Sequence, residues 1–258
     1  MTDEADADAD LDARLASVAD ALVEGGGAMA LTGAGVSTAS GVPSFRGENG
    51  IWGTEFDPND FHYSRFLRDP AEFWQDRLRL QETMFPDELE PNAAHRALVA
   101  LEDRGVLDGV ATQNTDGLHR AARQETLAEL HGNAARVECQ SCGAMTDAGP
   151  VFDRVRDGDN PPRCDCGGLY KPDVVLFGEN LDHETLARAE DLAMGSETVL
   201  AVGTSLQVNP AASLAGLGDR LVIVNFDETP YSTEATVDLR ADVTTALPRL
   251  VDLVDDRL

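Results

Sequence analysis

Lysine is almost absent from this chain: Lys171 is the only one among 258 residues, and every other basic residue is an arginine. Acidic residues number 47, and the formal net charge is −27. Because the acidic residues are spread through every segment of the chain, we interpret them as the solvating surface of a protein from a very salty cytoplasm. An acidic surface for cationic partners is the alternative. Either surface disfavours direct binding to nucleic-acid phosphates.

Long apolar runs are absent as well. No run approaches the roughly 20 residues that a membrane-spanning helix needs, so we expect no membrane partner. Residues 1–10 are acidic rather than cationic and apolar, which argues against a secretory signal and predicts a solvated tail. We therefore expect a cytoplasmic protein.

Cysteine is scarce, and all four cysteines lie in one window, as C-x2-C followed by C-x-C: Cys139, Cys142, Cys164 and Cys166. Two close pairs joined by a loop suit a tetrahedral zinc ion, and four thiolates leave no open position, so the metal would be structural. Two disulfides are disfavoured without a secretory signal, and four unrelated thiols are the other alternative. A nucleic-acid-binding zinc module has no support, because no basic stripe accompanies the cysteines.

The hydrophobic pattern predicts alternating helices and strands. Helical spacing is found over 11–23, 92–101 and 184–194, and short apolar runs occupy 28–31, 110–112, 127–130, 174–177, 198–202 and 221–224. Near-continuous apolar strands between helices are typical of an open α/β parallel sheet. Residues 137–170 break this pattern and predict a small insert.

Glycines follow the first apolar run, in the order Gly33-Ala34-Gly35. A strand that runs into a glycine turn lets the backbone approach a diphosphate. The usual G-x-G-x-x-G would place a third glycine where Thr38 stands. The residues alone therefore leave two interpretations open, a dinucleotide site or an ordinary glycine turn.

The wider motifs resemble those of the sirtuins, the NAD-dependent protein deacylases. Residues 33–46 match G-A-G-x-S-x-x-S-G-[IV]-P-x-F-R, residues 113–119 match Q-N-x-D-x-L-H, and residues 129–132 read E-L-H-G. Residues 172–179 resemble the family's substrate loop, and residues 203–206 match G-[TS]-S-L. Together with the charge, the resemblance suggests a halophilic archaeal sirtuin.

The resemblance implies an α/β fold: a Rossmann-like parallel sheet with a small four-cysteine zinc insert and a helical segment. Beyond the acidic tail, residues 11–258 would form a single catalytic domain. Its Rossmann-like part would comprise 11–42, 92–136 and 172–258, its helical segment 43–91 and its zinc module 137–171.

The resemblance also implies residue roles. His131 would be the general base, and Asn114 and Asp116 would orient the nicotinamide amide. Val175, Phe177 and Gly178 would bind an acetyl-lysine protein as an extended peptide. Contacts with NAD would come from Gly33, Ala34, Gly35, Ser37, Phe45, Arg46, Gln113, Asn114, Asp116, Gly203, Thr204, Ser205, Asn225, Asp242 and Val243.

The implied reaction removes acetyl groups from lysines and gives nicotinamide, O-acetyl-ADP-ribose and free lysine. Desuccinylation or demalonylation is an alternative, because Arg77 stands where the family members that take acidic acyl groups carry arginine. Trp74 replaces their tyrosine, so we expect Arg77 to form a surface salt bridge instead. ADP-ribosyl transfer, hydride transfer and a zinc-binding adaptor remain as further alternatives.

Overall fold

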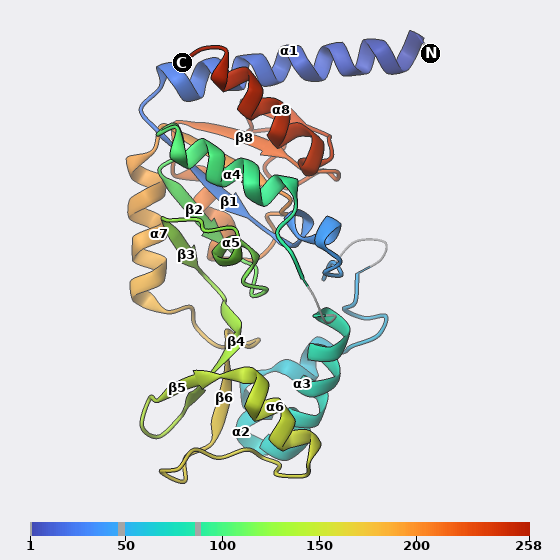
Figure 1. The fold of residues 1–258 in the computed structure, drawn as a ribbon, viewed down its shortest axis with the longest axis vertical. Coiled ribbons are helices and arrows are strands. Elements are labelled where there is room, and N and C mark those ends of the chain that lie inside the picture. The colour runs from blue at the N-terminus through green and yellow to red at the C-terminus, as the bar shows by residue number, and fades with distance from the viewer. Residues whose placement is uncertain (1, 46–49, 86–88) are drawn as a thin grey trace.

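The main sheet of the computed structural model, which describes residues 2–45, 50–85 and 89–258, has six strands (Figure 1). All its strand pairs are parallel, in the order β3-β2-β1-β7-β8-β9. The strands are β1 (Ala28–Thr32), β2 (Gly109–Thr112), β3 (Leu127–Glu129), β7 (Thr198–Val202), β8 (Arg220–Val224) and β9 (Val237–Leu239). The predicted Rossmann-like sheet is confirmed.

Helices cover both faces of this sheet. α1 (Thr2–Glu24), α4 (Ala93–Asp103) and α8 (Val243–Asp255) share one core with Ala28 and Ala30 of β1. α7 (His183–Gly195) and the 3₁₀ helix η4 (Ala211–Gly216) share the other with Met29 and Leu31. Because successive side chains of a strand alternate between faces, both sets of residues must be apolar. This explains the near-continuous apolar runs in the sequence.

The connections reverse direction at β1. From β1 the chain proceeds outward to β2 and β3 on one side, and later through β7, β8 and β9 on the other. Open α/β sheets bind ligands beyond the carboxyl ends of the strands at such a switch point. The crevice beyond Thr32 and Val202 is therefore the place where the fold favours a ligand site.

A smaller unit lies below the main sheet in the view of Figure 1. It contains a three-stranded antiparallel sheet, β5-β4-β6, from β4 (Gly132–Cys139), β5 (Met145–Asp147) and β6 (Tyr170–Val174). Its helices are α2 (Tyr63–Arg68), α3 (Pro70–Met84) and α6 (Ala148–Arg156), and η3 (Pro58–Phe61) precedes α2. One core unites Phe66, Phe73 and Trp74 with Phe152 and Tyr170, so the helical segment and the cysteine-bearing insert pack together.

Two elements differ from expectation. α1 begins at Thr2 rather than Leu11, because alanine favours helix formation and acidic residues stabilise a helix N-terminus. The predicted strand at 174–177 is a strand only up to Val174. Among the described residues, no helix has the length and apolar character needed to cross a membrane.

Candidate active site

The glycine turn after β1 packs directly on the turn after β7. The Gly35 N–H donates to the carbonyl oxygen of Gly203 at 2.8 Å. A Cβ at Gly35 would lie 2.9 Å from Gly203 Cα, and one at Gly33 would lie 2.8 Å from Thr204 Cβ. These contacts leave no room for side chains. The Ala34 N–H donates to no acceptor within the described part of the chain, so it is available to a ligand.

A hydrogen-bonded group of side chains lies beside this turn. Ser37 Oγ donates to Asp116 Oδ2 at 2.7 Å and accepts from Asn114 Nδ2 at 3.0 Å. Asn114 Nδ2 also lies 3.1 Å from the Gly33 carbonyl oxygen. Asp116 is held further by the Leu118 N–H at 2.8 Å, where α5 (Leu118–Ala121) begins. The loop after β1 is thus linked to the loop after β2 by the hydrogen bonds of Ser37.

Two histidines, His95 and His119, pack next to this group. The Asn92 N–H donates to His95 Nδ1 at 3.3 Å, so Nε2 carries the proton and points to Ser37 Oγ, 3.5 Å away. The His119 ring lies edge-on to that of His95, with centroids 4.8 Å apart. His119 Nε2 is 2.9 Å from Thr32 Oγ1. No sequence motif marks His95 as a site residue, although Asn92 and His95 form a capping box at α4.

Burial sets the charge of the group. It lowers the pKa of His95 to about 4 and that of His119 to about 3. Burial also raises the pKa of Asp116, against the opposing hydrogen bonds from Leu118 and Ser37. Because a low dielectric disfavours charge, both rings are neutral at ordinary pH. Both oxygens of Asp116 accept hydrogen bonds, from Ser37 and from the Leu118 N–H, and this favours its carboxylate form.

His131 follows β3 at the neighbouring strand end. Its Nδ1 lies 2.8 Å from the carbonyl oxygen of Gln113. A carbonyl oxygen only accepts, so Nδ1 carries the proton and Nε2 keeps a lone pair. Burial lowers the pKa of His131, although the hydrogen bond to Gln113 opposes the shift. The neutral ring can therefore accept a proton at Nε2.

The 175–178 segment lies next to His131. The Val175 N–H donates to the His131 carbonyl oxygen at 3.0 Å, and the Phe177 N–H donates to that of Phe61 at 3.2 Å. Phe177 is 38% exposed. Gly178 has a φ of +76°, and a Cβ there would lie 2.3 Å from His62 Cε1, so only glycine fits. The segment is fixed, yet one large aromatic ring remains accessible.

Other predicted residues lie around the same crevice. Gln113 Nε2 donates to Thr204 Oγ1 at 2.9 Å, which joins the ends of β2 and β7. Asn225 follows β8, and its Nδ2 donates to the Asp227 carbonyl oxygen at 2.8 Å. Asp242 caps α8 through the Thr244 N–H at 2.7 Å, so its Oδ1 already has a partner. Ser205 and Val243 directly follow Thr204 and Asp242.

Phe45 closes the crevice near Asn114. Its ring stacks on Trp52 with centroids 5.5 Å apart. The pocket that Phe45, Phe85 and Asn114 line has a volume of only about 10 Å³, less than a pyridine ring needs. The predicted Arg46 lies outside the described residues.

A larger cavity lies elsewhere, away from these residues. This open cavity has a volume of about 680 Å³ and lies between α7 and the small sheet. Arg120, Arg136 and Arg188 line it together with Glu129 and Asp173. Since charges of both signs are mixed there, its lining selects no ligand of one charge. We therefore place the site at the switch point.

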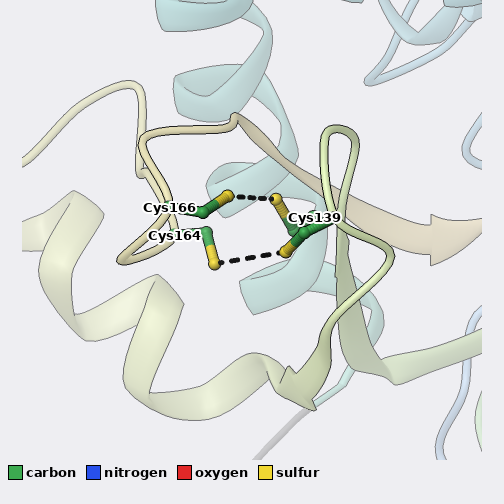
Figure 2. A group of neighbouring side chains, drawn as sticks. Cys139, Cys164 and Cys166 are labelled. Carbon is green, nitrogen blue, oxygen red and sulfur yellow. Dashed lines mark hydrogen bonds between the residues drawn. The ribbon is translucent and has the colours of Figure 1, made fainter.

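The four cysteines come together in the small unit, and Figure 2 shows Cys139, Cys164 and Cys166 pointing toward one another. Cys139 Sγ is 3.5 Å from Cys166 Sγ, and Cys142 Sγ is 3.9 Å from Cys164 Sγ. All four sulfur atoms lie within 4.8 Å of one another. Sulfur atoms about 2.3 Å from a tetrahedral zinc ion are about 3.8 Å apart, so the cluster fits zinc. The Ser141 and Cys142 amides lower the pKa of Cys139 to about 6, which favours the thiolate.

The comparisons with known proteins agree with this geometry. The Sir2 family model matches residues 33–210. The chain belongs to the Sir2 family. This confirms the resemblance that the motifs carry, and it makes the members of the family the appropriate comparison for the site.

Two curated relatives span nearly the whole chain. An NAD-dependent protein deacetylase from Haloarcula marismortui is 54% identical over 244 residues, which cover 92% of this chain and 94% of the relative. The expected halophilic archaeal source fits this relative. An NAD-dependent protein deacylase from Thermococcus kodakarensis is 40% identical over 237 residues, covering 89% of this chain and 91% of the relative.

Solved structures are similar too. A Sir2 variant with a deacetylated p53 peptide and 3′-O-acetyl ADP ribose has a TM-score of 0.85 at 36% identity, covering 92% of this chain and 96% of that chain. A Sir2 complex with a p53 peptide and NAD⁺ has a TM-score of 0.78 at 35% identity, covering 88% of this chain and 92% of that chain.

The expectation for Arg77 is wrong. Its side chain is buried, with 4% of the residue exposed, and it forms no salt bridge with a described carboxylate. Arg77 donates to Gln81 Oε1 at 3.3 Å, while its Nε has no partner among the described residues. Burial lowers its pKa to about 10. Arg77 lies on the α3 face that also carries Phe73 and Trp74, and this face is turned into the core.

Proposed function

We propose that the protein removes acetyl groups from protein lysines in an NAD-dependent reaction. The observation that carries this proposal is that the Ser37–Asn114–Asp116 group and His131 follow the neighbouring strands β1, β2 and β3, while His131 Nε2 has no partner among the described residues. The names of the relatives support it, since they are NAD-dependent deacetylases and deacylases. The products would be nicotinamide, O-acetyl-ADP-ribose and lysine.

NAD would be held by the crevice residues. The packed glycines Gly33 and Gly35 let a diphosphate approach the backbone, and the free N–H of Ala34 is a donor for it. Gly203, Thr204 and Ser205 border the same turn, and Asn225 with the Asp242–Val243 pair would flank the adenosine end. Gln113 and Ser37 would face the nicotinamide ribose. Phe45 and Arg46 would cover it.

Asn114 and Asp116 would orient the nicotinamide amide. An amide offers one acceptor and two donor hydrogens, and it matches a neighbouring carboxamide and carboxylate. Ser37 and the Leu118 N–H fix the Asp116 carboxylate, so little side-chain freedom is lost on binding. NAD, when bound, supplies the ribose carbon that takes up the acyl oxygen as nicotinamide leaves.

His131 would act as the general base. Its Nδ1–H is committed to Gln113, so only Nε2 is available, and it would take the proton of a ribose hydroxyl. A positioned base of this kind contributes roughly 10²–10⁴-fold to a rate. Its lowered pKa keeps Nε2 unprotonated over the neutral range.

The peptide would add as a strand along 175–178. The Val175 N–H is used by His131, whereas its carbonyl oxygen accepts no hydrogen bond within the described residues. This oxygen would accept the amide proton of the acyl-lysine, and Phe177 would line the path of the lysine stem. Gly178, with its positive φ, would let the chain turn at the end of this segment.

Removal of acidic acyl groups is a second candidate, because the buried Arg77 has no carboxylate partner in the described part of the chain. A succinyl or malonyl carboxylate would supply one. Trp74 does not contribute a second donor, since its Nε1–H is bonded to the Tyr170 carbonyl oxygen at 3.0 Å. We therefore favour acetyl as the group removed.

Mass spectrometry of products decides between these functions. The protein, kept in high KCl, would be incubated with NAD and matched acetyl, succinyl and malonyl peptides, then desalted. We expect loss of acetyl with O-acetyl-ADP-ribose as product. A mass gain of ADP-ribose on protein would indicate transfer, and absorbance of reduced nicotinamide would indicate a dehydrogenase. No NAD consumption by folded protein would contradict the proposal.

The cellular setting stays a prediction. We expect the enzyme to act in the cytoplasm without binding nucleic acid or membranes directly. The net charge of −27 supports the nucleic-acid part, because it opposes approach to phosphates.

A further inference from the structure

The only lysine of the chain is buried beside the 175–178 segment. Lys171 is 6% exposed. Its Nζ lies 3.1 Å from the Pro172 carbonyl oxygen, 2.9 Å from that of Val174 and 3.1 Å from Glu179 Oε2. An ammonium group has three N–H bonds, so each of them has an acceptor.

Glu179 completes the arrangement. Its Oε2 also accepts the Leu176 N–H at 2.9 Å, and the Glu179 N–H donates to the Leu176 carbonyl oxygen at 3.0 Å. The segment is therefore closed into a turn whose two ends are tied to one ammonium group. Lys171 holds the carbonyl that precedes Val175, and Glu179 holds the amide that follows it.

This leaves Val175 in a particular position. Its N–H is bonded to His131, the Val174 carbonyl to Lys171, and the Leu176 N–H to Glu179. Among the described residues, the Val175 carbonyl oxygen has no such partner. This unused acceptor is therefore fixed in direction by bonds on both sides of it.

The choice of lysine has a physical reason. Burying an ammonium group is unfavourable unless charge and hydrogen bonds compensate, and every other basic position in this chain is arginine. Arginine presents a wide planar fork, whereas lysine presents a compact charge with three donors. Three acceptors that converge on one point suit the ammonium group.

We propose that Lys171 and Glu179 are a positioning pair that presets the 174–178 segment for the acyl-lysine peptide. This inference rests on the proposed function of that segment. Neither side chain touches the reacting atoms; they act through the Val175 carbonyl. Their loss should weaken peptide binding and leave NAD binding nearly unchanged.

Kinetics of variants test the pair. We expect Lys171→Met to raise the peptide KM at least about tenfold, since two backbone bonds and an ion pair are lost, with an NAD KM within about twofold of wild type. Lys171→Arg should recover only part of the affinity. The control is Arg156→Met, which removes an exposed ion pair with Glu82 in the same small unit. An unchanged peptide KM in folded Lys171→Met would overturn the inference.

Glu179→Gln covers the case in which Lys171→Met does not fold. It keeps the shape and an acceptor oxygen but removes the charge, and we expect a smaller rise in the peptide KM. A Glu179→Gln enzyme that matched wild type in both KM values would also overturn the proposal.

A measurement on the wild-type protein is independent of any variant. Because Lys171 is the only lysine, ¹⁵N-lysine labelling gives a single side-chain ammonium resonance. We expect slow proton exchange and a shift on adding acetyl-lysine peptide, but no comparable shift with NAD alone. Peptide that binds without moving the resonance would refute the positioning pair and leave the proposed function intact. Failure of the peptide to bind at all would contradict the proposed function itself.

Discussion

The His131 side chain is tied to the main chain of Gln113, because its Nδ1–H donates to the Gln113 carbonyl oxygen at 2.8 Å. The two residues follow neighbouring strands, β3 and β2. Gln113 itself bonds Thr204 beyond β7. The imidazole is thus oriented by the ends of the sheet strands, and its tautomer leaves Nε2 as the only site for a proton.

The pH dependence of deacetylation should follow this tautomer. His131 has a pKa below its ordinary value of about 6.5, so Nε2 is unprotonated at neutral pH. We expect kcat to be flat above neutrality and to fall with a midpoint below about pH 6.5, as Nε2 becomes protonated. A pH–rate profile at constant KCl measures this. A rate that already falls between pH 8 and 7 would contradict the assignment.

Ser37→Ala should weaken the response to NAD. The change removes the donor to Asp116 and the acceptor of Asn114. Removing one of the two donors to this part-buried carboxylate costs about 1–3 kcal/mol, so we expect kcat/KM for NAD to fall roughly 10–100-fold. Ser213→Ala, the same change on η4, is the control. Equal kinetics of both variants would show that the network does not act on NAD.

Loss of one zinc ligand should destabilise the small unit. We expect one zinc per chain in the wild type by atomic absorption, and less in Cys142→Ser. Since the cysteines lie beside the core of Phe152 and Tyr170, the melting temperature should fall by roughly 6–12 °C, equivalent to about 3 kcal/mol. Ser141→Ala keeps all four thiols and serves as control. A zinc-free wild type with unchanged melting would refute the metal site.

The buried histidines predict a loss of stability in acid. The pKa values of His95 and His119 are about 4 and about 3 in the folded state, below about 6.5 in the unfolded state. As pH falls below 6.5, the unfolded chain therefore takes up protons that the folded chain does not, and folding weakens. For His95 the loss reaches roughly 3 kcal/mol near pH 4.

Imidazole NMR signals measure this directly. At pH 5 in the folded protein, His95 and His119 should both show neutral rings, with the His95 proton on Nε2. Urea unfolding at pH 7 and pH 5 should show a smaller pH effect in His119→Gln than in wild type. A charged His119 ring at pH 6 in the folded protein would contradict the expectation.

Much of the fold could be predicted because β1, β7 and β8 are short apolar runs buried on both faces. The four-cysteine cluster could be predicted because its residues form two close pairs within one short window of the sequence. The three-stranded sheet could not be predicted, because all three residues of β5 are exposed and its pairing with β4 depends on tertiary structure.

The structure places Gln113 directly after β2 and His131 two residues after β3, and polar residues at strand ends of this kind can be picked out from the sequence. His95 was missed, since a single histidine in a helical run has no sequence context that marks burial. For Arg77 a signal existed: it lies four residues after Phe73 and three after Trp74, both fully buried, and this spacing places all three on one helix face. The many acidic residues favoured the prediction of a surface ion pair for Arg77 instead.

The most direct test of the account separates the two roles assigned to the site. Asn114 and Asp116 would expose nicotinamide to departure, and His131 would act only afterwards. In folded His131→Ala enzyme with acetyl-lysine peptide, labelled nicotinamide should still exchange into NAD within about tenfold of the wild-type rate. Deacetylation should fall at least about 100-fold. Parallel loss of both activities, or full deacetylation by the variant, would contradict the assignment of His131 as the base.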